Sequence, residues 1–214
     1  MDIADQIVEY IELNRVSTTE VADVLGKTGE LDPQMRCLTP RSRAVGKLFY
    51  APSFNGSNWY THYFAQEAPQ NAVLYIEGVN CGNKAIFGDL VAKYTLLYKK
   101  AKGLVVSGYV RDAHQLVKEK YPIWCWGTTP IGCNNKDTGI DDAYYQARKE
   151  EFDGAIVVAD DSGVVVVKKH QLTQEFLDGV AAMELQEDIW YDCIDRLKYS
   201  TFETVCQKKY LMNK

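Results

Sequence analysis

The sequence predicts an α/β fold in which a layered mixed sheet is flanked by helices and followed by a long C-terminal helical tail. Short segments rich in branched and aromatic residues recur between residues 40 and 170, and Gly, Pro or Asp bounds them, as is typical of strands. Segments with helical periodicity alternate with these strands, which favours helices packed on a sheet. The 214 residues are 46% hydrophobic and contain no Pro/Ser-rich linker, so a single domain over 1–214 is expected.

Two helices are predicted within residues 1–30. The first covers 2–14, where apolar side chains recur at helical spacing. The second begins after Ser17, because Ser17 and Glu20 form the capping-box pattern, in which the serine accepts from a first-turn amide and the glutamate accepts from the serine N–H. This helix should end near Gly26, since glycine readily adopts the left-handed conformation that ends helices.

Strands are predicted for the α/β core over residues 40–170, and a helical tail is predicted over 171–214. The turn ADDSG joins the last two strands as a hairpin. In the tail, Trp190 and Tyr191 are expected to be exposed and available to a partner subunit. The strand segments are AVGKLFYA (44–51), AVLYIEG (72–78), GLVVSGYV (103–110), PIWCWG (122–127), GAIVVAD (154–160) and GVVVVKK (163–169).

Composition excludes several classes of function. A formal net charge of −5 and the absence of a basic run argue against nucleic-acid binding. The first residues lack a signal-peptide pattern, and no apolar segment has the length of a membrane span. The six cysteines form no CxxC pair and no metal-ligand spacing, so reduced thiols are expected. A cytoplasmic protein without membrane or nucleic-acid partners is therefore predicted.

The stretch from Gly88 to Asp112 brings charged residues together. A helix starting after Asp89 would carry the chain roughly 18–20 Å, and the strand ending at Val110 would return it by roughly 23 Å, so Asp89 and Arg111–Asp112 should meet at one edge. The apolar face expected for this helix consists of Leu90, Val91, Tyr94, Leu97, Tyr98 and Ala101.

Two carboxylates, one guanidinium and the free amides of a helix N-terminus would thus converge. This combination suits a small anionic ligand held with a divalent cation. The same residues also fit a plain helix cap beside a surface ion pair, and their spacing alone indicates no particular reaction.

The segments FGDL (87–90) and GLVVSGYVRD (103–112) resemble the signature of the RraA-like family. VSTTEVADVLGKTG (16–29) and IVVADDSGVVVV (156–167) resemble further blocks of that family in the same order, and the similarity extends over 17–169. The resemblance implies an RraA-like fold, which is similar to phosphohistidine domains. The family includes 4-hydroxy-4-methyl-2-oxoglutarate / 4-carboxy-4-hydroxy-2-oxoadipate aldolases, oxaloacetate decarboxylases and non-catalytic ribonuclease regulators.

By resemblance to the aldolases, Asp112 would be the direct ligand of Mg²⁺ or Mn²⁺. Asp89 would hold a metal-bound or reacting water, and Arg111 would contact the oxo or carboxylate oxygen of the substrate. The amides of Leu90 and Val91 would receive the substrate carboxylate. Magnesium commonly takes only one or two protein carboxylates. Cleavage beside a 2-oxo acid yields an enolate, which a cation and a guanidinium both stabilise.

The resemblance therefore implies a metal-dependent lyase acting on a 2-oxo acid, by aldol cleavage, aldol condensation or decarboxylation. The regulators lack the second acid of the Arg–Asp pair, whereas this chain keeps Asp112, which favours an enzyme. A non-catalytic, ring-shaped regulator is the alternative, as is a biosynthetic enzyme for a larger, sugar-acid-like substrate. The family also implies a homotrimer or hexamer with sites at subunit boundaries.

The sequence departs from the family at three places, and at the first of them the chain between Asp89 and Arg111 is one residue longer than in the aldolases. The turn YIEGVNCGN carries Glu77 and Asn80 in unusual positions, and Cys133–Asp153 replaces a strand pair with a segment that includes a charged helix, DDAYYQARKEEF. We expect this segment to cover the site and to set substrate choice.

Further acids and histidines are weaker candidates. By resemblance, Glu20 or Asp23, and Glu187 of a neighbouring subunit, would complete the site. Of the histidines, only His114 is expected near the site, facing solvent. His62 belongs to the segment WYTHYFAQE, for which packing in the core or at an interface is expected and the lining of a pocket is the alternative.

Overall fold

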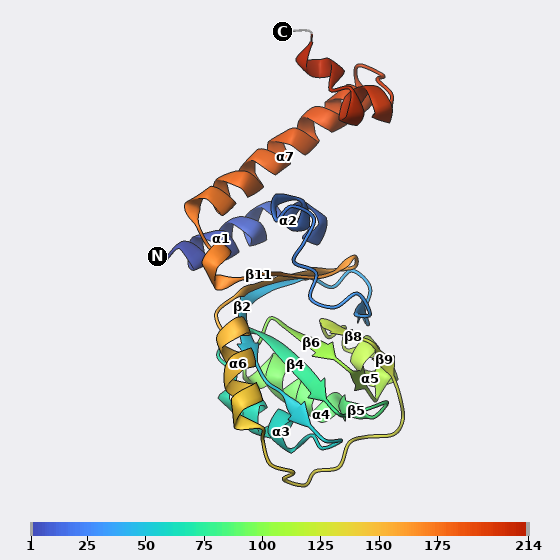
Figure 1. The fold of residues 1–214 in the computed structure, drawn as a ribbon. Coiled ribbons are helices and arrows are strands. Elements are labelled where there is room, and N and C mark those ends of the chain that lie inside the picture. Colours follow the sequence, from blue (N-terminus) through green and yellow to red (C-terminus); the bar gives the residue numbers. More distant parts are fainter. Residues whose placement is uncertain (1, 213–214) are drawn as a thin grey trace.

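The structure, a computed structural model, describes residues 2–212 and confirms the mixed sheet with flanking helices. The larger sheet has the order β1-β8-β6-β4-β2-β10-β11, with β3 paired to β4 (Figure 1). Its centre is parallel, whereas β1, β10 and β11 pair antiparallel with their neighbours. The strands are β1 (Arg36–Cys37), β2 (Ala44–Tyr50), β3 (Ser53–Phe54), β4 (Val73–Val79), β6 (Gly103–Ser107), β8 (Ile123–Cys125), β10 (Ile156–Asp160) and β11 (Gly163–Val167).

A second, three-stranded parallel sheet has the order β5-β7-β9. It comprises β5 (Ala85–Phe87), β7 (Tyr109–Val110) and β9 (Gly127–Thr128). The strand predicted over 103–110 is therefore wrong in one respect, because it is divided between the two sheets. The division lies at Gly108, whose N–H donates to the Val106 carbonyl at 2.9 Å. A Cβ at Gly108 would lie 2.5 Å from Ile86 Cδ1, so a larger residue would not fit at this break.

Helices lie around the sheets. They are α1 (Ile3–Asn14), α2 (Thr18–Val24), α3 (Trp59–Glu67), α4 (Asp89–Lys93), α5 (Ala113–Lys118), α6 (Asp142–Phe152) and α7 (Gln174–Asp195), with short turns η1 (Tyr94–Tyr98), η2 (Lys169–Gln171), η3 (Phe202–Cys206) and η4 (Lys209–Leu211). The predicted capping box of α2 is confirmed. Ser17 Oγ accepts from the Glu20 N–H at 3.2 Å, and Glu20 Oε2 accepts from the Ser17 N–H at 2.6 Å. No helix among residues 2–212 is long and apolar enough to cross a membrane.

Alternation along the strands fills both faces of the larger sheet. On β4, Leu74 and Ile76 join a core with α3 and α4, whereas Val73 and Tyr75 join a core that includes Phe152 of α6. A third core packs α1, α2 and α7 against β10 and β11. The hairpin predicted between the last two strands is confirmed by the pairing of β10 with β11.

The helix predicted after Asp89 has a different buried face from the expected one. It is α-helical only to Lys93 and continues as the π-helical turn η1. Ala92 and Thr95 are 0% exposed, whereas Leu90 and Tyr98 are 78% and 70% exposed. Small side chains face the protein here, because they let the helix lie close to the second sheet. Of the expected apolar face, Val91 and Ala101 are buried, and Leu90, Tyr94, Leu97 and Tyr98 are exposed.

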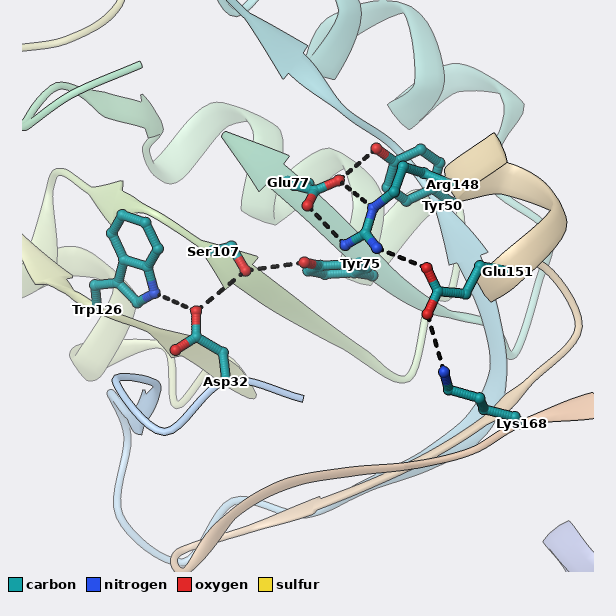
Figure 2. A network of polar contacts seen from close by, with 9 residues as sticks. All are labelled: Asp32, Tyr50, Tyr75, Glu77, Ser107, Trp126, Arg148, Glu151 and Lys168. Carbon is teal, nitrogen blue, oxygen red and sulfur yellow. Dashed lines mark hydrogen bonds and ion pairs between the residues drawn. The ribbon is translucent and has the colours of Figure 1, made fainter. Parts of the chain in front are cut away.

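A network of polar contacts ties α6 and the segment before β1 to the carboxyl ends of β4 and β6 (Figure 2). Arg148 of α6 donates to both oxygens of Glu77, at 2.8 and 3.2 Å, and Tyr50 donates to Glu77 at 2.5 Å. On the other side, Asp32 accepts from Trp126 Nε1 at 2.7 Å. The network explains the unusual Glu77, since this residue anchors the helix within the replaced segment 133–153.

The C-terminal tail forms an arm that projects from the sheet (Figure 1). Its main helix, α7, packs on α1 and α2, and Tyr10 of α1 donates a hydrogen bond to Glu184. Tyr191 is 67% exposed, as expected, but Trp190 is partly buried. The arm is not one helix to residue 210, because α7 ends at Asp195.

Candidate active site

The ends of β5 and β7 bring Asp89, Arg111 and Asp112 together. These strands are parallel neighbours, and the Arg111 N–H donates to the Phe87 carbonyl at 2.9 Å. Asp112 Oδ2 accepts from the Asp89 N–H at 3.1 Å and lies 3.7 Å from Arg111 Nε. The predicted convergence is therefore observed. Its direct cause is the parallel pairing of β5 with β7, which places the residues after each strand at one edge.

Two glycines make room for these side chains. A Cβ at Gly88 would lie 2.1 Å from Asp112 Oδ2, and a Cβ at Gly132 would lie 2.9 Å from an Arg111 guanidinium nitrogen. Asp112 itself adopts a left-handed conformation, with φ of 58°, directly before α5. Aspartate tolerates this conformation better than most residues, so the Arg111–Asp112 turn is encoded locally.

A cavity of about 220 Å³ opens at this edge. The predicted residues Leu90, Val91, Arg111 and Asp112 line it, and Asp89 lies between the lining residues Gly88 and Leu90. The first backbone hydrogen bond of α4 runs from the Ala92 N–H to the Gly88 carbonyl, so the amides of Leu90 and Val91 precede the helical ladder. The remaining lining residues are Asn58, His62, Ala85, Phe87, Gly132, Cys133 and Asn135.

The donor set at this edge fits a hard divalent cation. Asp89 Oδ1 is buried and has no hydrogen-bond partner among residues 2–212, and the Asp112 side chain, which accepts from the Asp89 N–H, is 46% exposed. Residues 2–212 contain no group of three His, Cys, Asp or Glu side chains placed to hold a metal ion. Mg²⁺ commonly takes one or two carboxylates from a protein, with water filling the other positions.

Asn58 is a cavity residue that the sequence prediction missed, and His62 lines the cavity, which was the less favoured alternative for its segment. Asn58 precedes α3, and His62 lies one turn later, where its N–H donates to the Asn58 carbonyl at 3.1 Å. Asn58 Oδ1 is buried without a hydrogen-bond partner in the described chain. Loss of hydration lowers the pKa of His62, which keeps its ring neutral at pH 7. The sequence signal that could have identified these cavity residues is an Asn and a His four residues apart at the start of a helix.

His114 faces solvent as expected, but the expectation that it is the histidine near the site is wrong. Its side chain is exposed on α5 and does not line the cavity, whereas His62 does. The helix α5 starts directly after Asp112 and leads away from the cavity, so closeness in sequence did not become closeness to the site.

Only the beginning of the segment 133–153 lines the cavity. Cys133 and Asn135 are lining residues, held by backbone bridges of the preceding Gly132 to Ala85 and of Asn134 to Ser57. In contrast, α6 packs on β2 and is anchored by Glu77. The expectation that the whole segment covers the site is therefore corrected, since its helix belongs to the core.

A second thiol stands behind Cys133. Interaction with the Cys133 thiol lowers the pKa of Cys81. The same contact raises the pKa of Cys133. Cys133 lines the cavity, whereas Cys81 is buried behind it.

The other candidate acids lie away from this cavity within the same chain. Glu20 caps α2, and Asp23 forms a 3.0 Å ion pair with Lys27. Loss of hydration, followed by the charges of Glu20 and Asp23, raises the pKa of Glu187 on α7. None of these three acids lines the cavity formed by residues 2–212 of one chain.

Two relatives match much of the chain. Protein DlpA of Legionella pneumophila is 28% identical over 194 residues, covering 84% of this chain and 30% of DlpA, so the chain spans less than a third of that relative. A protein of Halalkalibacterium halodurans named "Putative 4-hydroxy-4-methyl-2-oxoglutarate aldolase" is 27% identical over 165 residues, covering 75% of this chain and 76% of the relative.

Solved structures share the fold. A crystal structure of an uncharacterized protein from Pseudomonas syringae pv. tomato has a TM-score of 0.73 at 24% identity and covers 95% of this chain and 98% of its own. Streptomyces coelicolor RraAS2, described as an unusual member of the RNase ES inhibitor RraA protein family, has a TM-score of 0.66 at 25% identity and covers 86% and 94%.

The RraA-like family, described as Aldolase/RraA, matches residues 18–166. That range is more than half of the chain and includes Asp89, Arg111 and Asp112. The protein therefore belongs to the RraA-like family.

Proposed function

We propose that this protein is a divalent-metal-dependent lyase that acts on a 2-oxo acid, by aldol cleavage or condensation or by decarboxylation. The observation that carries the proposal is the convergence of Arg111 and Asp112 at one cavity, with Asp89 between its lining residues Gly88 and Leu90 and with Asp89 Oδ1 left without a hydrogen-bond partner among residues 2–212. A buried carboxylate oxygen without a partner is costly, and a ligand with a cation or a water would satisfy it.

Each residue has a task in this proposal. Asp112 and the water held by Asp89 would position Mg²⁺ or Mn²⁺, which when bound supplies Lewis-acid stabilisation of negative charge on the substrate's oxo oxygen. Arg111 donates to the same oxygen or to the neighbouring carboxylate through its planar guanidinium. The amides of Leu90 and Val91 receive the carboxylate. The carboxylate of Asp89 accepts the proton that a bound water releases.

Aldol cleavage and decarboxylation share one requirement. In both, the bond between C3 and C4 of the 2-oxo acid breaks, and its electron pair moves toward the oxo oxygen on C2. Arg111 stabilises that oxygen in either case. The relative from H. halodurans carries an aldolase name, which supports the aldol direction as the first to test.

A non-catalytic regulator of the same fold is the second candidate. The likeness to RraAS2, which is described as belonging to an RNase ES inhibitor family, supports it. The two candidates differ in one measurable respect, because only the lyase needs Asp112 for chemistry.

Exchange of the pyruvate methyl protons in D₂O tests the proposal without knowledge of the substrate. We expect the wild type to catalyse this exchange with Mg²⁺ or Mn²⁺, followed by NMR, and to lose it in EDTA. Asp112→Ala should lose activity by at least about 10³-fold, whereas Asp178→Ala on the exposed face of α7 should not change it. Absence of exchange in the wild type, or full exchange by Asp112→Ala, would refute the lyase.

The proposed assembly is a homotrimer or a hexamer of two trimers. Large apolar side chains are exposed on the arm, including Leu185 at 65%, and on α4, where Leu90 at 78% borders the cavity. Burial of these faces between subunits would place each site at a boundary. Light scattering should give three or six chains per particle, and a monomer at micromolar concentration would exclude this assembly.

A further inference from the structure

A second cavity, here named the Asp32 cavity, lies at the carboxyl ends of the central strands of the larger sheet. Glu77 of β4 and Ser107 of β6 are partners in register, and Trp126 directly follows β8; all three line the cavity together with Asp32. Its volume of about 350 Å³ falls in the range of about 300–1,000 Å³ that is typical of small-molecule sites. Open α/β sheets bind ligands at the carboxyl ends of their parallel strands. The Asp32 cavity shares no described lining residue with the candidate active site.

Charge is almost balanced in the network around this cavity (Figure 2). Arg148 pairs with Glu77 at 2.8 Å and with Glu151 at 2.6 Å, and Lys168 pairs with Glu151 at 3.0 Å. The two acids in these pairs are therefore matched by two cations. Asp32 is the remaining charged residue of the network.

Asp32 has only neutral hydrogen-bond partners in the described part of the chain. Its carboxylate accepts from Trp126 Nε1 at 2.7 Å, from the Gln34 N–H at 2.8 Å and from the Ser107 hydroxyl at 3.4 Å. The side chain is partly exposed and lines the cavity. The network thus carries one excess negative charge, which attracts a cation and repels an anion.

The acids of the cavity wall have little acceptor capacity left. A carboxylate has about four acceptor positions, and Asp32 already accepts three hydrogen bonds from the protein. Glu77 also accepts three, one from Tyr50 and two from Arg148. A primary ammonium brings three N–H donors that each need an acceptor. A fully alkylated ammonium brings the same charge and needs none, so it fits this wall better.

The other partly exposed groups on the wall are aromatic. Trp126 and Tyr144 both line the cavity. The Trp126 ring is held by its hydrogen bond to Asp32 and by an edge contact with Tyr109, at 6.1 Å between ring centroids. The Tyr144 ring packs edge-on against Phe54 at 6.2 Å. Aromatic rings attract alkylated ammonium ions, tryptophan most strongly, and rings that are already held lose less freedom on binding.

We propose that the Asp32 cavity is a binding site for a small alkylated ammonium ion of the choline type. Asp32 supplies the counter-charge, and Trp126 and Tyr144 supply the aromatic contacts. This site is separate from the cavity at Asp112 and does not depend on the lyase proposal.

Titration of the full chain with choline and with 3,3-dimethylbutan-1-ol tests the proposal. The two compounds have the same shape, but carbon replaces the charged nitrogen in the alcohol. Calorimetry at constant ionic strength should show choline bound at least about tenfold more tightly. Equal affinities, or no binding of choline, would overturn the proposal.

Ethanolamine and phosphocholine define the class of cation. Ethanolamine carries a primary ammonium and should bind at least about threefold more weakly than choline. Phosphocholine adds the phosphate of a lipid headgroup, which the acidic network should repel, so it should also bind more weakly. Tighter binding of ethanolamine would refute the alkylated class, and tighter binding of phosphocholine would refute a free cation in favour of a headgroup.

Two variants locate the site. Asp32→Asn keeps an oxygen that can accept from Trp126 but removes the charge, and it should weaken choline by about tenfold. Tyr144→Leu should weaken choline by about threefold to fivefold. The matched controls are Asp178→Asn on α7 and Tyr63→Leu on α3, where both side chains are exposed, and these should bind choline as the wild type does.

Circular dichroism should show that all four variants are folded, and the comparison of choline with its neutral isostere needs no variant. Unchanged choline affinity in folded Asp32→Asn would overturn the placement of the site. Pyruvate exchange by the wild type tests the lyase separately, because pyruvate carries no ammonium group.

Discussion

The cavity at Asp112 and the network around Glu77 are built from the same residue types but differ in how completely their polar groups are paired. In the network, Arg148 binds both oxygens of Glu77, and the two side chains are 27% and 14% exposed (Figure 2). In the cavity, Arg111 and Asp112 are 51% and 46% exposed and 3.7 Å apart.

This difference separates structural charges from candidate functional ones. Arginine and carboxylates occur in both regions, so residue type alone does not distinguish them. An ion pair whose hydrogen-bonding groups are all used fixes one element to another, as the pair of Glu77 with Arg148 fixes α6. An unsaturated group such as Asp89 Oδ1 has bonding capacity that the chain does not use, and native proteins leave few such groups without a reason. Four predictions test this distinction, beginning with the largest expected effect.

Asp89→Asn should slow pyruvate exchange by about 10³-fold, the middle of the range for loss of a positioned general base. The metal should still bind, because Asp112 is the proposed direct ligand. Exchange followed by NMR and Mn²⁺ affinity followed by electron paramagnetic resonance would measure the two properties, with Asp178→Asn as the matched control. Loss of Mn²⁺ binding would show that Asp89 is itself a direct ligand.

Arg148→Met should lower the free energy of unfolding by about 3 kcal/mol, because it leaves Glu77 largely buried without its cation. Urea denaturation measures this change. Arg196→Met is the matched control, since Arg196 is 79% exposed and its pair with Asp192 should contribute less than about 0.5 kcal/mol. Adding Glu77→Gln to Arg148→Met should restore part of the loss. Equal effects at Arg148 and Arg196 would contradict a structural role for the network.

Arg111→Lys should slow exchange by about 10²-fold, or about 2.7 kcal/mol in activation free energy, because lysine keeps the charge but loses the planar fork. The unfolding free energy should change by less than about 0.5 kcal/mol, since Arg111 is half exposed. A variant that is unstable but fully active per folded molecule would place Arg111 with the structural charges instead.

Tyr10→Phe should have the smallest effect, below about 1 kcal/mol, because the pair is partly exposed. The hydrogen bond to Glu184 raises the Tyr10 pKa to about 12 from 10.0. Since the folded-state pKa is the higher one, the bond's contribution is complete below about pH 10 and is lost as pH rises from 10 to about 12. Urea midpoints of the wild type and variant should therefore differ at pH 8 and converge near pH 12. A constant difference would show that Tyr10 acts by packing alone.

Local features of the sequence were sufficient for much of the fold. The capping box at Ser17 and Glu20 and the hairpin after Asp160 depend on neighbouring residues, so their patterns predicted them. The nearly equal lengths of the helix after Asp89 and of the strand that ends at Val110 also predicted the meeting of the two acids. These interactions are fixed by short-range geometry and by strand pairing.

The burial and the partners of individual side chains could not be predicted from such local patterns. The exposed Leu90 and the buried Thr95 reverse the expected face of the helix after Asp89, because the sheet accepts only small side chains at that contact. Similarly, the link between Glu77 and Arg148 joins residues 71 positions apart. No periodicity or spacing encodes such a partner, since both residues also suit a solvated surface.

By itself, then, the sequence determined the family, the long strands of the larger sheet, and the edge where Asp89 meets Asp112. Only the tertiary structure placed Asn58 and His62 in the wall of that cavity, about fifty residues from Arg111 along the chain. It also decided which charges are paired and which remain open to a ligand. The physical reason is that hydrogen-bond saturation and burial depend on every element packed around a group, whereas capping, periodicity and turns depend on the few residues beside it.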